Sequence, residues 1–254
     1  MQYLSVDEAK DKAGLKLVLS AGVPGPWGES LKAILAYKGI EYLPVRQEGG
    51  GENADVQAWT GQSSAPVLVG EGFPPVSHWL DQLHLAERLH PAPALLPEDM
   101  SQREQVLGMS ALVVGVDGIG WNRRVQMIAP AMALDEPPEM LSRLAHKYGC
   151  TPEAIPVAAR RLVNILKRLD TVLEQQQARG SDYFVGDSVT AVDFYWANFA
   201  AMFKPLPYDV NPMPDYLRTS YERIDEACTA AFTPRLERHR DAMYERHITL
   251  PLDF

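Results

Sequence analysis

A proline-rich break at residues 90–97 divides this sequence into two parts with different hydrophobic patterns. Pro91, Pro93 and Pro97 stand within seven positions. A helix cannot continue through them, because proline lacks an amide donor and its ring clashes with the preceding turn. Short alternating runs and glycine turns precede the break, whereas the chain after Glu98 has mostly helical spacing. The two parts are therefore expected to fold as different classes of domain.

The break predicts residues 1–90 as an α/β domain, residues 91–99 as a linker and residues 100–254 as an all-helical domain. The chain has 254 residues, which suffices for two ordinary domains, and its 46% hydrophobic content is typical of globular proteins. A chain of this length can bury a substantial core without disulfides or a metal ion.

The first part has the pattern β-α-β-α-β-β-α. Its segments are a strand at 15–20, a helix at 27–37, a strand at 41–45, a short helix at 55–59, two strands at 64–69 and 73–76, and a helix at 77–89. A helix joins the first two strands, so we expect them to be parallel. The glycines at 70–72 predict a hairpin turn, and Ser77 is the expected N-cap of the last helix.

The second part has helical spacing throughout. The predicted helices are 101–127, 135–149, 151–173, 192–203, 214–224 and 234–246. Glycines loosen the first of these helices. Thr151 and Pro152 are the expected cap and first residue of the third helix.

Charge and cysteine content exclude several classes of function. The formal net charge is −9 and no basic stripe is visible, so we expect neither a nucleic acid nor an anionic membrane as partner. Cys150 and Cys228 are far apart and form no disulfide or zinc pattern, so no metal is expected. The sequence has no long apolar run and begins without a signal-peptide pattern, which predicts a cytoplasmic protein.

Three short segments, taken with the order of elements, resemble the glutathione S-transferase superfamily. They are Ala-Pro-Val-Leu at residues 65–68, Lys-Gly-Ile-Glu-Tyr at 38–42, and Phe-Val-Gly-Asp-Ser-Val-Thr-Ala-Val-Asp at 184–193. The resemblance covers nearly the whole chain. It implies a thioredoxin-like N-terminal domain, a helical C-terminal domain and a homodimer. It also implies glutathione as co-substrate and a hydrophobic electrophile as second substrate.

Two of these segments carry specific structural expectations. In the family, the proline at the position of Pro66 is cis, and the residue before it, here Ala65, offers its main-chain N–H and C=O to an extended peptide. A trans proline at the start of a strand is the alternative. Thr190 and Asp193 resemble the family's capping box, with Val189 as its hydrophobic staple. That motif concerns folding and carries no catalytic chemistry.

The sequence departs from the family at the position that handles the sulfur. Active members place a Ser, Cys or Tyr near the start of the first helix, because such a group lowers the pKa of the thiol. Here the Ser/Cys position falls on Gly25. Pro26 and Trp27 keep the residues that commonly follow it, and the resemblance implies that they contact the ligand. Ser20 and Ser30 are the candidate catalytic substitutes. Their alternative reading is a serine at a strand end and a serine on a helix surface.

A second departure concerns the residues that hold the γ-glutamyl end of glutathione. Where the family has a glutamate or glutamine followed by a serine, this chain has Val76 followed by Ser77, so only the serine is kept. Ser77, at the start of its helix, can still receive a carboxylate, and His78 stands beside it. No acid remains for the ammonium group, which puts ordinary glutathione affinity in doubt.

A third group lies on the first helix of the second domain, which in the family lines the active-site cleft. Trp121, Arg123 and Arg124 suit an anionic, partly apolar ligand. A solvated basic turn with a buried tryptophan is the alternative. Adjacent arginines cannot both face one site on a regular helix, so at most one is a direct ligand.

These residues leave two hypotheses. In the first, the protein binds glutathione or a related anionic thiol and conjugates or processes a hydrophobic electrophile. In the second, it is a non-catalytic member of the fold that binds a small ligand or a protein. The first hypothesis, or a changed ligand, is favoured by the retained Ala65, Pro66 and Ser77 and by the Trp/Arg cluster at 121–124. Gly25 and Val76 favour the second hypothesis.

Overall fold

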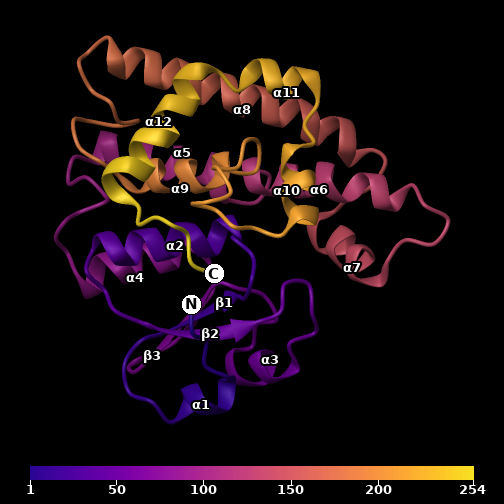
Figure 1. Ribbon diagram of the computed structural model, residues 1–254. Coiled ribbons are helices and arrows are strands. Elements are labelled where there is room, and N and C mark those ends of the chain that lie inside the picture. The colour runs from indigo at the N-terminus through magenta and orange to yellow at the C-terminus, as the bar shows by residue number, and fades with distance from the viewer.

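Four short strands form one mixed sheet in the order β2-β1-β3-β4. The computed structural model describes all residues 1–254, and Figure 1 shows this sheet beneath the helical part of the molecule. The strands are β1 Lys16–Ser20, β2 Leu43–Gln47, β3 Val67–Gly70 and β4 Phe73–Val76. β1 and β2 are parallel, as predicted, and β3 and β4 form the predicted hairpin. The predicted second strand at 41–45 lies two residues too early.

The strand pairing brings one end of each of the four strands to the same edge of the sheet. Ser20 pairs with Gln47 at the carboxyl ends of the parallel strands β1 and β2. β3 runs antiparallel to β1, and β4 antiparallel to β3. The amino end of β3 and the carboxyl end of β4 therefore lie at the same edge. Ligands of open α/β sheets bind outside the carboxyl ends of parallel strands, so this edge is the first place to look for a site.

Four helices accompany the sheet: α1 Val6–Lys10, α2 Pro26–Tyr37, α3 Ala54–Thr60 and α4 Trp79–Leu89. The sequence did not predict α1, a one-turn helix started by a Ser5–Glu8 capping box. Ser77 is not the N-cap of α4, which is a correction. His78 holds that position and makes no side-chain capping bond.

The rest of the chain is helical, as predicted. Its helices are α5 Met100–Val114, α6 Ile119–Met132, α7 Glu139–Tyr148, α8 Ala154–Gln177, α9 Ala191–Ala200, α10 Asp215–Glu222, α11 Glu226–Ala231 and α12 Pro234–His247. The prediction of a single helix over 101–127 is wrong, because the helix is interrupted between α5 and α6. Asp117 there has a left-handed φ of 62°, and a Cβ on Gly118 would lie 2.8 Å from the Leu112 carbonyl oxygen.

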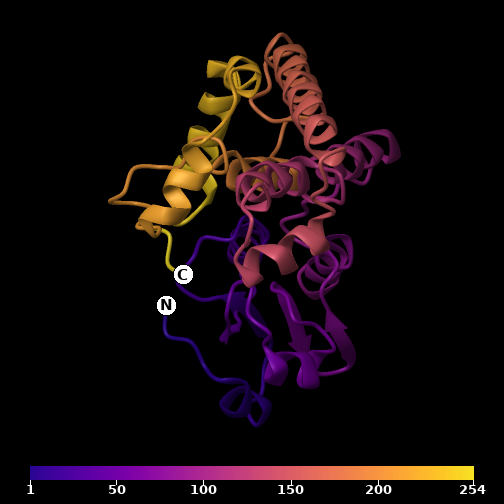
Figure 2. The same cartoon turned by 90° about the vertical axis from the view of Figure 1, so that its right-hand side faces the viewer.

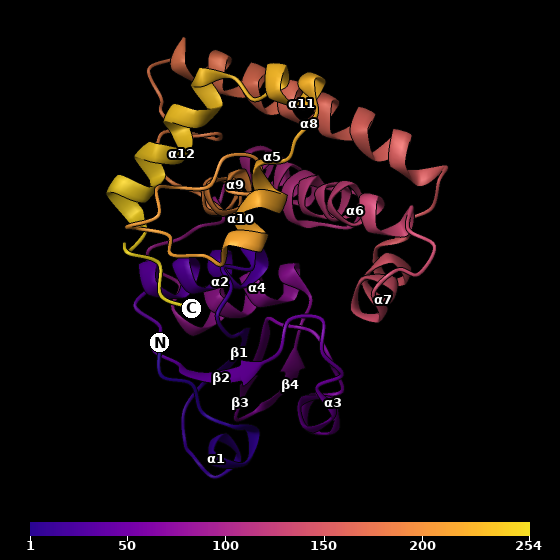
Figure 3. The same cartoon turned by 45° about the vertical axis from the view of Figure 1, so that its right-hand side comes forward.

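The two domains share one hydrophobic core. α2 and α4 lie between the sheet and the upper helices, as Figures 1 and 3 show. Residues of β1 and α2 belong to the same buried cluster as the aromatic side chains of α9. The buried Lys38 ammonium at the end of α2 also fixes the connecting segment, since it binds Glu87 Oε1 and the Pro93 carbonyl, both at 2.7 Å. These contacts fix the helical domain on the sheet domain.

The two termini lie close together beside α2, as Figure 2 shows. The Met1 ammonium binds the Asp253 carboxylate, and the Lys32 ammonium donates to the Asp253 main-chain carbonyl at 2.5 Å. None of the helices is both long enough and apolar enough to cross a membrane.

Candidate functional site

The first turn of α2 has free main-chain donors. Gly25 is the N-cap, with φ −66° and ψ 120°, and offers no side-chain cap. Pro26 follows at the first helical position, where its missing N–H is tolerated. The N–H groups of Trp27 and Gly28 bond to no acceptor in the chain, whereas the Glu29 N–H donates to the Gly25 carbonyl at 2.9 Å. This helix start can therefore accept an anion from outside.

The Ala65–Pro66 turn leaves a second free group at the same edge. The Ala65–Pro66 peptide bond is cis. Neither the N–H nor the C=O of Ala65 has a hydrogen-bond partner in the chain. The Pro66 carbonyl accepts from Gln82 Nε2 at 3.0 Å, and the same amide donates to the Val76 carbonyl at 2.9 Å. The buried Gln82 thus ties the turn to the start of α4, a role that no sequence pattern predicts.

The start of α4 is also open. Ser77 and His78 are both exposed, and the Ser77 hydroxyl makes no hydrogen bond. The His78 imidazole lies 3.7 Å from the Asp81 carboxylate, so it is paired within its own helix. Both residues lie where β4 ends, next to the Ala65–Pro66 turn. Ser77 therefore remains a candidate for receiving a carboxylate.

The two serines proposed as catalytic substitutes already donate hydrogen bonds within the chain. The Ser20 hydroxyl donates to Gln47 Oε1 at 2.7 Å, across the ends of β1 and β2. Ser30 is fully buried, and its hydroxyl donates to the Pro26 carbonyl at 2.7 Å. Neither hydroxyl is free to donate to a sulfur atom, and Ser30 is not on the helix surface.

Trp27 connects the two domains. Its indole N–H donates to the Val114 carbonyl at 3.0 Å, and its ring meets Phe199 edge to face at 4.9 Å. Gly120 on α6 allows this approach, since a Cβ there would lie 2.2 Å from Phe199 Cε1 and 2.7 Å from Trp27 Cη2. Trp27 thus serves packing, and it places the start of α2 against α6.

Arg123 serves the helical core. Its side chain is 1% exposed. The guanidinium donates to the Met202 and Tyr221 carbonyls at 3.0 Å and to Gln126 Oε1 at 2.7 Å. Burial lowers the pKa of this group to about 10. Arg123 therefore holds α6 to the segments around α9 and α10, which corrects its expected role as a ligand residue.

Arg124 is the opposite case. It is half-buried, and its guanidinium forms no ion pair with a carboxylate and no hydrogen bond to a main-chain carbonyl. The guanidinium carbon lies 6.0 Å from the centre of the Tyr221 ring. Arg124 also lies one helical turn after Gly120, on the face of α6 that meets Trp27. Of the two adjacent arginines, it is the one that remains free.

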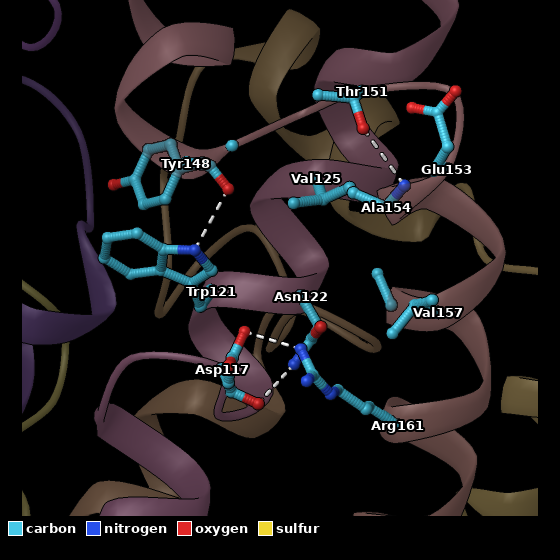
Figure 4. Close-up of a pocket in the computed structure, with 12 residues that line it drawn as sticks. Asp117, Trp121, Asn122, Val125, Tyr148, Thr151, Glu153, Ala154, Val157 and Arg161 are labelled. Carbon is cyan, nitrogen blue, oxygen red and sulfur yellow. Dashed lines mark hydrogen bonds and ion pairs between the residues drawn. The ribbon is translucent and has the colours of Figure 1, made fainter.

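Trp121 lines a separate hollow of about 360 Å³ between α6, α7 and α8. Its indole N–H donates to the Tyr148 carbonyl at 3.0 Å. Figure 4 shows Asp117, Asn122 and Arg161 together on one side of this hollow. Arg161 forms an ion pair of 2.6 Å with Asp117. None of the sheet-edge residues lines it. Trp121 and Arg124 therefore do not contribute to one pocket, contrary to the grouping drawn from the sequence.

Helix α7 reaches across to the sheet edge, which the sequence did not predict. The Lys147 ammonium donates to the Ser64 hydroxyl at 2.8 Å, and Arg143 donates to the Gly50 carbonyl at 3.2 Å. Figure 3 shows α7 above α3, beside this edge. Two cations from the helical domain thus lie near the Ala65–Pro66 turn. No group of three or more His, Cys, Asp and Glu side chains is placed to hold a metal ion.

Comparisons with known proteins agree with this architecture. Residues 152–241 match the family model described as glutathione S-transferase, C-terminal domain. The protein has the glutathione S-transferase fold. No curated protein sequence matches the chain significantly.

Solved structures share the glutathione S-transferase fold along nearly the whole chain. A transferase from Methylobacterium radiotolerans, in complex with glutathione sulfonate, is 19% identical, with a TM-score of 0.62 and 91% of each chain covered. Rice GST1, in complex with glutathione, is 19% identical, with a TM-score of 0.62 and coverage of 95% of this chain and 93% of that one.

A family member from Pseudomonas fluorescens, with two glutathione bound, is 13% identical, with a TM-score of 0.65 and coverage of 95% and 94%. The structural similarity over nearly the whole chain establishes the fold. Within it, this chain has main-chain groups without partners at one sheet edge and an unpaired guanidinium on the facing helix.

Proposed function

We propose that the protein binds glutathione or a closely related anionic thiol at this sheet edge and conjugates it, through its sulfur, to a hydrophobic electrophile held against α6. The observation that carries the proposal is the pair of unused main-chain groups at Ala65, beside the uncapped start of α2. Buried or half-buried main-chain groups are nearly always paired in a folded protein. Unpaired groups on neighbouring segments therefore fit an external peptide.

Three parts of such a ligand have a partner at the edge. The main chain of a cysteinyl residue pairs with the N–H and C=O of Ala65, as an added strand does. A carboxylate binds at the start of α4, near Ser77. The sulfur then lies at the start of α2, near the N–H groups of Trp27 and Gly28.

The start of α2 supplies the chemistry. A helix N-terminus stabilises an anion by up to ~2 kcal/mol in a partly buried setting, which corresponds to roughly 1.5 units of thiol pKa. The thiol loses its proton to solvent, and the thiolate attacks the electrophilic carbon. A carbon–sulfur bond forms as the leaving group departs with its electron pair. No side-chain hydroxyl takes part in this scheme, in agreement with the engagement of Ser20 and Ser30.

A matched pair of substitutions at Gly25 tests the placement of the sulfur. A Cβ on Gly25 meets no atom within 4 Å, and Asp and Asn are both good N-caps. Gly25→Asp places a carboxylate where the thiolate is expected, whereas Gly25→Asn adds a neutral side chain of the same shape. Isothermal titration with glutathione should show at least about ten-fold weaker binding for Gly25→Asp than for Gly25→Asn.

Equal affinities in the two variants would place the sulfur elsewhere. Absence of glutathione binding in the parent protein would exclude the transferase and favour the non-catalytic ligand-binding alternative. The same alternative follows if glutathione binds but turnover of 1-chloro-2,4-dinitrobenzene does not exceed the uncatalysed rate. Conjugation that depends on Gly25 in the same order as binding would support the transferase.

The domain limits, location and assembly belong to the same proposal. We place the domains at residues 1–90 and 100–254 and the protein in the cytoplasm. A homodimer is supported by the outer face of α5 and the turn that follows it, where Gly108, Ala111, Leu112 and Val116 are exposed although the opposite face is buried. Sedimentation velocity should give twice the mass of one chain, and a single-chain mass would exclude the dimer.

A further inference from the structure

The cluster around Arg124 contains polar groups that the fold leaves unsatisfied. Tyr221 on α10 is 1% exposed, and its hydroxyl has no hydrogen-bond partner. Buried polar groups without partners are rare, and each one calls for an explanation. The Arg124 guanidinium lies 6.0 Å from the Tyr221 ring centre and pairs with no carboxylate of the chain. A cation and a buried hydroxyl thus lie side by side, and neither is bound to an acid of the chain.

Tyr148, the last residue of α7, completes the cluster. Figure 4 shows its hydroxyl directed away from Asn122 and Arg161, and so away from the hollow that those residues line. Burial lowers the pKa of Arg124, but the nearby Tyr221 and Tyr148 hydroxyls outweigh that effect, so the pKa lies above its ordinary value. Both tyrosine hydroxyls thus lie close to the guanidinium.

The surrounding charges leave this cluster positive. Arg123, the adjacent cation, is committed to main-chain carbonyls. The nearest acid of the segment after α10, Asp225, binds Gln126 Nε2 at 2.8 Å and the Cys228 N–H at 2.7 Å. Lys147 on α7 adds another cation, directed to Ser64. No carboxylate of the chain pairs with Arg124, so an external anion has no competitor there.

We propose that Arg124, together with the Tyr148 and Tyr221 hydroxyls, binds an acidic group of the second substrate, which makes that substrate an anionic electrophile. The inference rests on the proposed transferase function. A carboxylate has acceptor atoms for a guanidinium and two hydroxyls at once. Arg124 lies one turn of α6, about 5.4 Å, beyond the glycine that contacts Trp27, so a small aromatic acid anchored there reaches toward the start of α2.

Two probes of equal shape and different charge test the subsite without any reaction. 4-Nitrobenzoate and 4-nitrobenzamide are titrated by calorimetry into the parent protein, Arg124→Gln, Tyr221→Phe and the control Arg160→Gln, an exposed arginine on α8. We expect the parent and the control to bind the benzoate about ten-fold more tightly than the amide. Arg124→Gln should bind both equally, and Tyr221→Phe should reduce the preference about three-fold.

Equal binding of the two probes by the parent, or no binding of either at millimolar concentration, would overturn the inference. So would a benzoate preference that persists in Arg124→Gln. Circular dichroism and thermal unfolding of each variant show whether a loss reflects the missing group or a failure to fold. Tyr221→Phe, which removes only a hydroxyl without a partner, keeps the test decisive if Arg124→Gln unfolds.

Glutathione titrated into the same samples separates this inference from the proposed function. Arg124→Gln should leave glutathione affinity unchanged, because the thiol is placed at the sheet edge. A parent that prefers the benzoate but binds no glutathione would refute the transferase, not the anion subsite. A parent that binds glutathione and shows no benzoate preference would refute only the subsite. A glutathione affinity that falls with Arg124→Gln would assign the anchor to the thiol peptide and overturn the inference.

Discussion

The starts of helices α2 and α9 show two uses of the same structural position. At α9 the Asp193 carboxylate accepts from the Thr190 N–H at 2.8 Å, the Thr190 hydroxyl at 2.9 Å and the Phe184 N–H at 3.0 Å. His239 Nε2 lies 2.9 Å from the same carboxylate. At α2 the N-cap is Gly25, and two N–H groups remain free. The two helices pack against each other, so one core contains a closed helix start and an open one.

This contrast separates stability from binding. The hydrogen bonds at the start of α9 stabilise the fold and leave nothing for a ligand. The start of α2 forgoes a side-chain cap, which costs at most a few tenths of a kcal/mol with glycine at that position. The same contrast recurs between Arg123, whose donors are used, and Arg124, whose donors are not.

Asp193→Ala should have the largest effect, because it opens the closed helix start. The substitution leaves the Thr190 and Phe184 groups without an acceptor in a fully buried site. Removing one member of a buried charged network typically costs about 3–5 kcal/mol. The free energy of unfolding in urea, measured beside the exposed control Asp187→Ala, checks this. A loss below about 1 kcal/mol would mean that the capping box is not what holds α9.

Arg123→Met should have the second largest effect and lower the free energy of unfolding by about 3 kcal/mol. It removes donors to the buried Met202 and Tyr221 carbonyls, which then lack partners. Arg124→Gln, next to it in the sequence, should change the free energy of unfolding by less than about 0.5 kcal/mol, because Arg124 pairs with no carboxylate and no buried main-chain carbonyl. Parallel urea titrations of the two variants check the pair. Equal losses would contradict the division of roles between the two arginines.

The capping box was predictable because its partners are three residues apart. Thr190 and Asp193 form the same arrangement in any helix start, so the local sequence determines it. The order of strands and helices followed from periodicity for the same reason. The break at Gly118 was missed, because glycine only weakens a helix and the carbonyl that a Cβ would meet is set by the folded backbone.

The candidate site was predictable only in part. The roles expected of Ala65, Pro66 and Ser77 follow from the resemblance to the family, and these residues do lie at one sheet edge. The roles of Arg123 and Arg124 could not be separated, because the carbonyls that satisfy Arg123 belong to residues about 80 to 100 positions away. Trp27 was read as a ligand residue for the same reason, since its partner Val114 lies in the other domain.

Glu29 gives a smaller effect and a pH dependence that belongs to the open helix start. Its carboxylate lies in the first turn of α2, is 6% exposed, and pairs with Lys32 at 2.9 Å. Burial raises its pKa, and Lys32 only partly opposes this. The folded state then binds more protons than the unfolded state above the ordinary glutamate pKa. Its contribution to stability is therefore complete below that pKa and is lost as the pH rises through the folded value.

Glu29→Gln should flatten this dependence. The free energy of unfolding of the parent should fall more steeply between pH 4.5 and 7 than that of the variant, with the exposed Glu52→Gln as control. Urea titrations at several pH values measure the slopes. Identical slopes in the parent and Glu29→Gln would mean that Glu29 titrates normally in the folded protein.

Gly25→Ser should have the smallest effect on stability and the clearest effect on chemistry. The backbone at Gly25 suits any residue, a Cβ there meets no atom within 4 Å, and serine exceeds glycine as an N-cap by only a few tenths of a kcal/mol. The added hydroxyl can donate to a thiolate at the start of α2. A charge-assisted hydrogen bond of about 1.5 kcal/mol would raise the thiolate fraction of bound glutathione about ten-fold below its pKa.

The apparent thiol pKa of bound glutathione, read from thiolate absorbance in the ultraviolet, should therefore fall in Gly25→Ser and stay unchanged in Gly25→Ala. Conjugation rates at pH 6.5 should rise in the same order. If glutathione still binds to Gly25→Ser but its thiol pKa does not fall and the conjugation rate does not rise, the sulfur does not lie at the open start of α2. The free N–H groups of Trp27 and Gly28 would then need another anion, and the contrast between α2 and α9 would no longer be one between catalysis and stability.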